Sequence, residues 1–153
     1  LRFAPALPLD GCRAMCYHGS MEQKKGFLSA EALLAAAKEA LCPMQFRGGE
    51  GGQVACALQT ESGALFTGIC IDLPCQLGFC AEQAAFAEML KSGERRVMQL
   101  VAVNTEGRIY PPCGKCREFL YQIDEGNLQT QIRLSTERSV PLFELLPARW
   151  DEK

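Results

Sequence analysis

Apolar and polar residues follow two different periods along this chain. Between residues 29 and 43 apolar side chains recur every three to four positions, which predicts an amphipathic helix. Ser29 can cap the first turn of this helix, and Pro43 ends it. Residues 54–60 and 64–71 are instead short apolar runs joined by a turn of Glu, Ser and Gly, which predicts a β-hairpin.

Helices and strands are expected to alternate in the rest of the chain. We expect helices over residues 80–91, from about residue 113 onward and over 141–146, and strands over 97–103 and near 130–134. The run at 97–103 is continuously apolar, which is typical of a strand covered on both faces. The order favours an α/β fold: a three-layer α/β/α sandwich with a mixed five-stranded sheet.

Two segments fall outside this pattern. Residues 48–52 are rich in glycine and lack the lysine of a phosphate-binding loop, so we expect a flexible connection there. Residues 1–20 are expected to be an N-terminal extension or residues added in cloning. Residues 21–153 would then form a single domain, because a chain of 153 residues fits one hydrophobic core.

The composition is typical of a globular protein and argues against several other classes of protein. Hydrophobic residues at 48% and charged residues at 22% are typical of a globular domain, and no apolar run approaches the ~20 residues of a membrane span. A net charge of -2 gives no basic excess, so neither nucleic acid nor membrane is an expected partner. Nine cysteines cannot all pair, and the first 20 residues do not resemble a signal peptide. We therefore expect a reduced, cytoplasmic protein.

The candidate chemistry lies in two short segments, Cys-Ala-Glu at 80–82 and Pro-Cys-Gly-Lys-Cys at 112–116. Each places a cysteine where a helix is expected to begin, and the free N–H groups and dipole of a helix start stabilise a thiolate. Cys113 and Cys116 are three residues apart, so both can face one point. If the two helix starts lie side by side, Cys80 completes a three-thiolate site that suits zinc and leaves a fourth position open for water.

Glu82 and Arg117 would complete such a site. A carboxylate beside a metal-activated water can take its proton and deliver it elsewhere, which is the role expected of Glu82. A divalent cation held by three thiolates carries one net negative charge. Arg117 and the two helix starts are the candidates that draw charge from the sulfurs.

Two other interpretations of these cysteines remain open. Cys113 and Cys116 also fit a redox-active Cys-x-x-C pair. A structural zinc site is the second, with Cys70 or Cys75 as the fourth ligand. A redox protein holds no zinc, so metal analysis separates it from the two kinds of zinc site.

The two segments together resemble the zinc-dependent cytidine deaminase family, in particular its small, three-cysteine, usually homotetrameric branch, which also includes the blasticidin S deaminases. The resemblance extends to Val-Ala-Cys-Ala-Leu at 54–58, Phe-Thr-Gly at 66–68 and Glu-Leu-Leu-Pro at 144–147, followed by Trp150. It covers roughly residues 29–150, with the segments in consistent order.

This resemblance implies hydrolytic deamination of cytidine or 2′-deoxycytidine, or of close analogues including N4-substituted ones, to the uridine product in pyrimidine salvage. Cys80, Cys113 and Cys116 would hold one zinc ion per subunit. Hydroxide on the zinc would attack C4 while Glu82 moves a proton to N3 and then to the departing amino group. The partners implied are a small-molecule nucleoside and further copies of the chain, in a homotetramer with shared active sites.

Substrate contacts are implied in the same way. The Ala81 N–H would hold the ring carbonyl, and the Pro111 carbonyl would receive the amino group. Asp72 could accept a ribose hydroxyl, whereas Cys70 stands where the family has asparagine and is a weak substitute for an amide. Gln83 stands where an arginine often follows the catalytic glutamate.

Two aromatic residues complete the list of candidates. The aromatic residue that the family carries before the first strand is absent here, and Phe46 could reach the site in its place. Trp150 is either a lid over a neighbouring subunit's substrate or a core or interface anchor. These departures leave the substrate open, and a blasticidin S-type deaminase is the alternative to a deaminase of plain cytidine.

Overall fold

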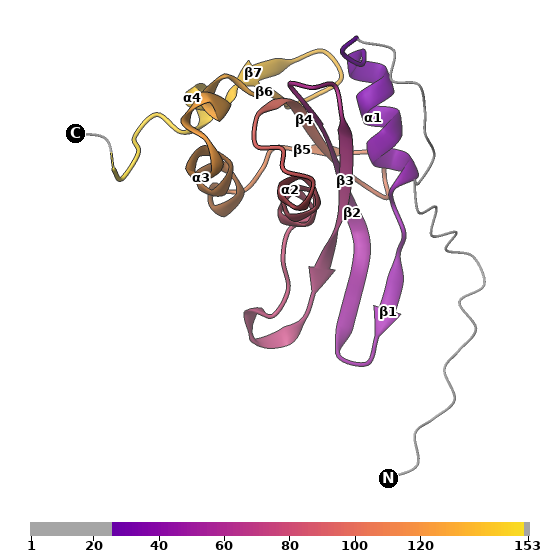
Figure 1. Ribbon diagram of the computed structural model, residues 1–153. Coiled ribbons are helices and arrows are strands. Elements are labelled where there is room, and N and C mark those ends of the chain that lie inside the picture. The colour runs from indigo at the N-terminus through magenta and orange to yellow at the C-terminus, as the bar shows by residue number, and fades with distance from the viewer. Residues whose placement is uncertain (1–25, 152–153) are drawn as a thin grey trace.

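A seven-stranded sheet with helices on both faces organises the computed structural model, which describes residues 26–151 (Figure 1). The predicted extension, residues 1–20, lies outside the described residues. The strands are β1 (Met44–Phe46), β2 (Gly49–Thr60), β3 (Leu65–Asp72), β4 (Val97–Asn104), β5 (Ile109–Tyr110), β6 (Gln131–Arg133) and β7 (Ser139–Pro141).

The sheet is mixed, as predicted, because β4 and β6 run parallel while the other paired strands are antiparallel. Its order is β1-β2-β4-β6-β7, with β3 paired to β2 and β5 paired to β4. The predicted count of five strands is too low. The additional strands, such as β1 with three residues and β5 with two, are too short to show an alternating pattern in the sequence.

Four α-helices cover the sheet within the described part of the chain: α1 (Ala30–Glu39), α2 (Ala81–Lys91), α3 (Gly114–Ile123) and α4 (Leu142–Leu145). The Ser29 hydroxyl accepts a hydrogen bond from the N–H of Ala32 at 3.2 Å and caps α1, as predicted. Figure 1 shows α1 on one side of the sheet and α2 and α3 on the other. The predicted three-layer sandwich is confirmed. None of the helices in residues 26–151 has the length and apolarity needed to cross a membrane.

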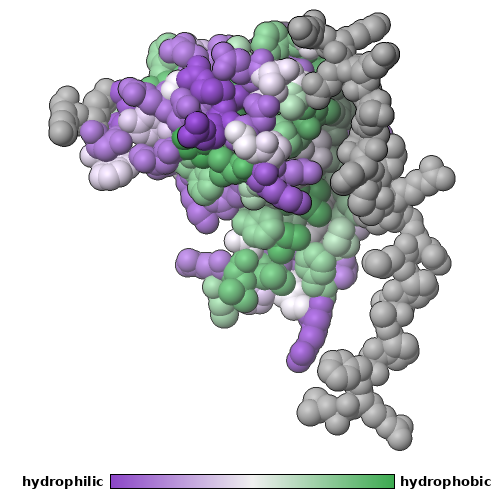
Figure 2. Space-filling view, in the orientation of Figure 1, coloured by the Kyte–Doolittle hydropathy of each residue, from purple (hydrophilic) through white to green (hydrophobic). Residues whose placement is uncertain are grey.

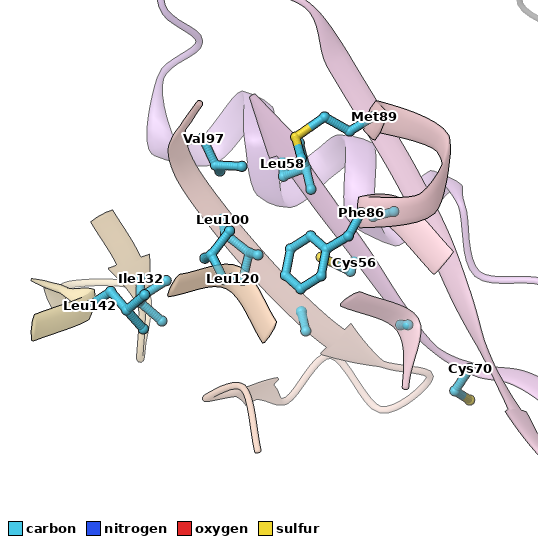
Figure 3. Close-up of a cluster of buried hydrophobic side chains, with 13 residues drawn as sticks. Cys56, Leu58, Cys70, Phe86, Met89, Val97, Leu100, Leu120, Ile132 and Leu142 are labelled. Carbon is cyan, nitrogen blue, oxygen red and sulfur yellow. The ribbon is translucent and has the colours of Figure 1, made fainter. Parts of the chain in front are cut away.

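Alternate residues of the central strands face opposite helices. Ala57 of β2 and Val101 of β4 pack against Leu33 of α1, whereas their neighbours Leu58 and Leu100 face the other layer. The core on that second face is drawn in Figure 3 and includes Cys56, Leu58, Phe86, Met89, Leu100, Leu120, Ile132 and Leu142. Burial on both faces explains why residues 97–103 are continuously apolar.

The glycine-rich segment is not a flexible connection, contrary to the prediction. It forms the start of β2, where Gly51 pairs with β1 on one side and β3 on the other. A Cβ atom at Gly51 would lie 2.9 Å from the Ile71 side chain and 3.0 Å from the Cys70 carbonyl oxygen. Gly52 has a φ of +76°, which the irregularity in β2 between Gly51 and Ala55 accommodates. Glycine here serves close strand packing.

Gly68 of β3 has a related function toward α2. A Cβ atom at this position would collide with the backbone of Ala81 and Ala85, in the first turns of α2. The absence of a side chain therefore allows α2 to lie directly against β3. This close approach positions the beginning of α2, where the candidate site lies.

Candidate metal centre

Two helix starts bring the three predicted cysteines together. Cys80 is the N-cap residue of α2, Cys113 is the N-cap residue of α3, and Cys116 lies in the first turn of α3. The Sγ atom of Cys113 is 3.6 Å from the Sγ of Cys80 and 3.6 Å from the Sγ of Cys116. All three sulfur atoms lie within 4.8 Å of one another, so they could hold one metal ion.

The spacing of these sulfurs fits zinc. Tetrahedral zinc with bonds of about 2.3 Å to sulfur places its sulfur ligands about 3.8 Å apart, close to the 3.6 Å found between Cys113 and each of its partners. Cys70 and Cys75 are not in this group. The Cys70 sulfur instead accepts a hydrogen bond from the Val54 N–H at 3.3 Å. Among the described residues the group therefore supplies three ligands, as an open, reactive zinc site requires.

The metal-free thiols have unequal acidities. Burial raises the pKa of Cys80 to about 11, and the hydrogen bond with Cys113 adds to this effect. Burial and the nearby Glu82 carboxylate raise the pKa of Cys116 further. Burial also acts on Cys113, but the hydrogen bond from the Cys116 backbone N–H and the contact with the Cys116 sulfur outweigh it and lower the pKa of Cys113. Three thiolates in this space therefore need a cation.

Glu82 lies beside the three thiols in the first turn of α2 and is only 5% exposed. Burial raises the pKa of its carboxyl, while a backbone N–H and the Cys116 thiol act in the opposite direction. A carboxyl group that is costly to ionise and faces a cavity is suited to taking up and releasing a proton.

A cavity of about 410 Å³ opens beside these residues. Its walls come from β2, β3, the start of α2 and the segment leading into α3. Among the predicted substrate contacts, Cys70, Asp72, Ala81 and Pro111 line it, and so does Gln83. Its volume is that of a site for a small organic molecule.

The chain matches no protein-family profile. Its sequence is similar to curated bacterial cytidine deaminases: it is 32% identical to that of Shewanella baltica over 96 residues and 36% identical to that of Photorhabdus laumondii over 90 residues. These alignments cover 61% and 57% of this chain, which spans only 30% and 28% of the length of the two relatives.

Solved structures agree with the sequence relatives. The chain superposes on the cytidine deaminase of Mycobacterium tuberculosis with a TM-score of 0.69 and 24% identity, covering 82% of this chain and 99% of that one. For the cytidine deaminase of Burkholderia pseudomallei the TM-score is 0.64 with 26% identity, covering 78% and 98%. The chain is thus similar to cytidine deaminases in sequence and in fold. It has their fold, and Cys80, Glu82 and Cys113 line the cavity.

Two predicted substrate contacts, Phe46 and Trp150, do not line the cavity. Phe46 lies on β1 against Gly51 and is 37% exposed. Trp150 is 78% exposed on the C-terminal segment, which is attached to α3 by a hydrogen bond of 3.2 Å from the Tyr121 hydroxyl to Asp151. The predicted role of Phe46 at the site stays a prediction. So does the predicted lid formed by Trp150, which requires a second copy of the chain.

Arg117 makes its hydrogen bonds to carbonyl oxygens and not to sulfur. Its Nε donates to the Pro112 carbonyl at 2.7 Å and its terminal nitrogen donates to the Leu145 carbonyl at 3.1 Å. The side chain thus connects the start of α3 to the end of α4. Its predicted withdrawal of charge from the thiolates stays a prediction.

The cavity also contains residues that sequence reasoning missed: Phe79, Tyr110 and Lys115. Phe79 belongs to the loop between β3 and α2, and Figure 2 shows apolar side chains gathered around this loop. Leu77 of the same loop is 71% exposed. Lys115 stands inside the Cys-Gly-Lys-Cys segment, but the sequence carried no signal that it borders the cavity.

Proposed function

We propose that this chain catalyses the hydrolytic deamination of cytidine or 2′-deoxycytidine to the uridine product, with zinc held by Cys80, Cys113 and Cys116. The observation that carries the proposal is the buried Glu82 carboxyl, which lines a cavity together with Cys80 and Cys113, two members of the three-thiol group. The similarity to cytidine deaminases in sequence and fold supports the same reaction.

The chain's own residues would divide the work as follows. Bound zinc supplies a Lewis acid that lowers the pKa of a water molecule toward neutrality. Glu82 accepts one proton from the water and transfers it to N3 of the ring. It then takes the second proton from the hydroxyl group added at C4 and delivers it to the departing amino group, so that uridine and ammonia result. The Ala81 N–H lies at the start of α2, where no carbonyl of the helix can accept it, and is free to bind the ring carbonyl. The Pro111 carbonyl oxygen, which proline retains like any other residue, accepts a hydrogen bond from the amino group.

The alternative interpretations explain less of this arrangement. A redox pair needs Cys113 and Cys116 but gives no function to Cys80, whose sulfur is also 3.6 Å from that of Cys113. A structural zinc site would not explain why Glu82 is buried next to the three thiols, where burial raises the pKa of its carboxyl. A blasticidin S-type deaminase would use the same reaction on a larger nucleoside, so it concerns the substrate alone.

Assembly and location are further parts of the proposal. We infer a cytoplasmic homotetramer with shared active sites, in which Trp150 reaches the cavity of a neighbouring copy. Size-exclusion chromatography with light scattering measures the assembly. A monomer that turns over cytidine at full rate would contradict the shared site.

The test of the reaction uses the full chain loaded with zinc. Cytidine, 2′-deoxycytidine, blasticidin S and N4-substituted cytidines are incubated with it, and the ultraviolet spectrum and released ammonia (or amine) are recorded. We expect conversion of at least one compound, loss of conversion after chelation and recovery when zinc is returned. A protein that binds zinc at the three cysteines and releases neither ammonia nor amine would be a structural zinc protein, and the proposal would fail.

A further inference from the structure

Lys115 lines the cavity and has no partner among the residues that the structure describes. It lies between Cys113 and Cys116 in the first turn of α3, and its side chain is exposed. No hydrogen bond or ion pair of this ammonium group occurs within residues 26–151, where the ion pair that does form joins Arg96 to Asp124. The charge of Lys115 is therefore free to meet a ligand.

Helix stability does not explain this lysine. The N-terminal end of a helix dipole is positive, so a cation in the first turn is disfavoured there. Lys38 and Lys91 occupy the last turns of α1 and α2, where the dipole favours a positive charge. Lys115 thus occupies a position that opposes its charge, and such local conflicts are expected at functional sites.

The other charged groups of the cavity do not neutralise Lys115. Asp72 at the end of β3 and Glu82 at the start of α2 also line the cavity, but neither lies within ion-pair distance of the lysine. A neutral ribose offers hydroxyl groups, which Asp72 can accept, and it offers no anion for an ammonium group. The cavity therefore presents one unmatched cation to whatever enters it.

We propose that Lys115 is a specificity-determining residue that binds an anionic substituent, a phosphate monoester or a carboxylate, on the nucleoside substrate. This inference rests on the proposed deaminase function and adds the chemical class of its substrate. A competing role for Lys115 is to offset the negative charge of the three thiolates. That role would alter metal binding and the turnover of every substrate alike, so experiment can separate the two.

The experiment compares kcat/KM for cytidine, cytidine 5′-monophosphate and the cytidine analogue whose 5′-carbon is a carboxylate. The zinc-loaded full chain is used as wild type and as the Lys115→Met and Lys115→Arg variants. The matched control is Lys91→Met, which removes a lysine at the far end of α2. Zinc affinity is measured for each protein by competition with a chromophoric chelator.

We expect the wild type to prefer an anionic compound over cytidine, and the compound preferred identifies the phosphate or the carboxylate as the group bound. In Lys115→Met the ratio of kcat/KM for the anionic compound to that for cytidine should fall about tenfold, equivalent to about 1.4 kcal/mol. Lys115→Arg should retain most of the preference, and Lys91→Met should retain all of it. High salt should reduce the preference of the wild type.

A ratio that is the same in Lys115→Met and wild type would overturn the inference. So would an equal loss for all three compounds accompanied by weaker zinc binding, which assigns Lys115 to the thiolates. If the wild type deaminates none of the compounds, the proposed function fails instead. Titration calorimetry with uridine 5′-monophosphate and uridine then still reports whether Lys115 distinguishes an anionic from a neutral nucleoside.

Discussion

The beginnings of α2 and α3 carry reactive side chains, whereas the ends of the same two helices are joined by a buried hydrogen-bond network. Where α2 and α3 begin, Cys80, Cys113 and Cys116 face one another beside the cavity. Where they end, the fully buried Asn127 uses its whole side-chain amide: Oδ1 accepts from the Val97 N–H at 2.8 Å, and Nδ2 donates to two backbone carbonyls, those of Arg95 at 2.9 Å and Leu120 at 3.0 Å.

The difference shows how the fold separates stability from chemistry. The side-chain amide of Asn127 binds backbone groups with both its oxygen and its nitrogen, which fixes the chain after each helix. At the other end burial raises the pKa of Glu82 and of two of the thiols, so these groups are held in an environment that opposes their charge. Rigid packing at one end allows reactive groups to be held in place at the other.

The largest effect is expected from Glu82→Gln, which keeps the shape of the side chain and removes its ability to transfer protons. We expect kcat to fall about 10³-fold while zinc stays bound, because general acid–base catalysis contributes on that order. Steady-state kinetics and metal analysis measure the two quantities. Glu88→Gln, on the exposed face of the same helix, is the control and should keep wild-type activity. Retained activity in Glu82→Gln would remove the proton-transfer role.

Cys116→Ser should have the next largest effect by removing the buried ligand of the three. We expect zinc affinity to fall by at least about 100-fold, because a neutral hydroxyl replaces a thiolate. Competition with a chromophoric chelator gives the affinity. Cys75→Ser, at an exposed cysteine outside the three-thiol group, should bind zinc as wild type does. Equal affinities for the two variants would place the metal elsewhere.

Asn127→Ala tests the stabilising end. It leaves the Val97 N–H and the carbonyls of Arg95 and Leu120 without the amide, so we expect the free energy of unfolding to fall by about 2–4 kcal/mol. Urea titration measures this change. Gln129→Ala, at an exposed position two residues later, should change it by less than about 0.5 kcal/mol. If both variants unfold at the same urea concentration, the Asn127 contacts do not stabilise the fold.

The smallest effect is expected from Arg96→Met at the same end. The hydrogen bond from Arg96 lowers the pKa of Asp124, assisted by the Gly126 N–H. A lowered carboxyl pKa stabilises the fold above the unfolded value of about 3.9 and stops doing so as pH falls through the folded value. The free energy of unfolding of wild type should therefore exceed that of the variant by less than about 1 kcal/mol at pH 7, and the difference should shrink as the pH falls below the unfolded value.

Thermal unfolding between pH 3 and pH 7 measures this convergence. Arg47→Met, at an exposed position on the turn between β1 and β2, is the control and should give curves parallel to wild type across the range. A constant difference between wild type and Arg96→Met at every pH would mean that the arginine acts through packing rather than through Asp124.

Local patterns predicted the layers and the reactive residues, whereas contacts over long sequence distances escaped them. The helical period beginning at Ser29 and the apolar run at 97–103 were sufficient for the sandwich, since both record burial directly. The cysteine spacing and the expected helix starts placed the three thiols together. Asn127 was missed because its partner Val97 is 30 residues away and an isolated asparagine in a sequence usually indicates a turn.

The glycine-rich segment shows a further reason for error. Composition treats glycine as a sign of flexibility, but at Gly51 the missing side chain makes room for a neighbouring strand. Lys115 was missed because a sequence shows its neighbours Cys113 and Cys116 but does not show the cavity that all the lining residues form together.

Because Gly68 allows α2 to lie against β3, the geometry of the candidate metal site depends on how closely this helix packs on the sheet. Ligand distances in a metal site tolerate deviations of about 0.2 Å, whereas a single added methyl group at residue 68 would collide with the α2 backbone and force a larger shift. Because Cys80 and Glu82 both belong to the beginning of α2, they would move together relative to the thiols of α3. Zinc affinity would then report small displacements of the helix from the sheet, even in variants whose overall stability is unchanged.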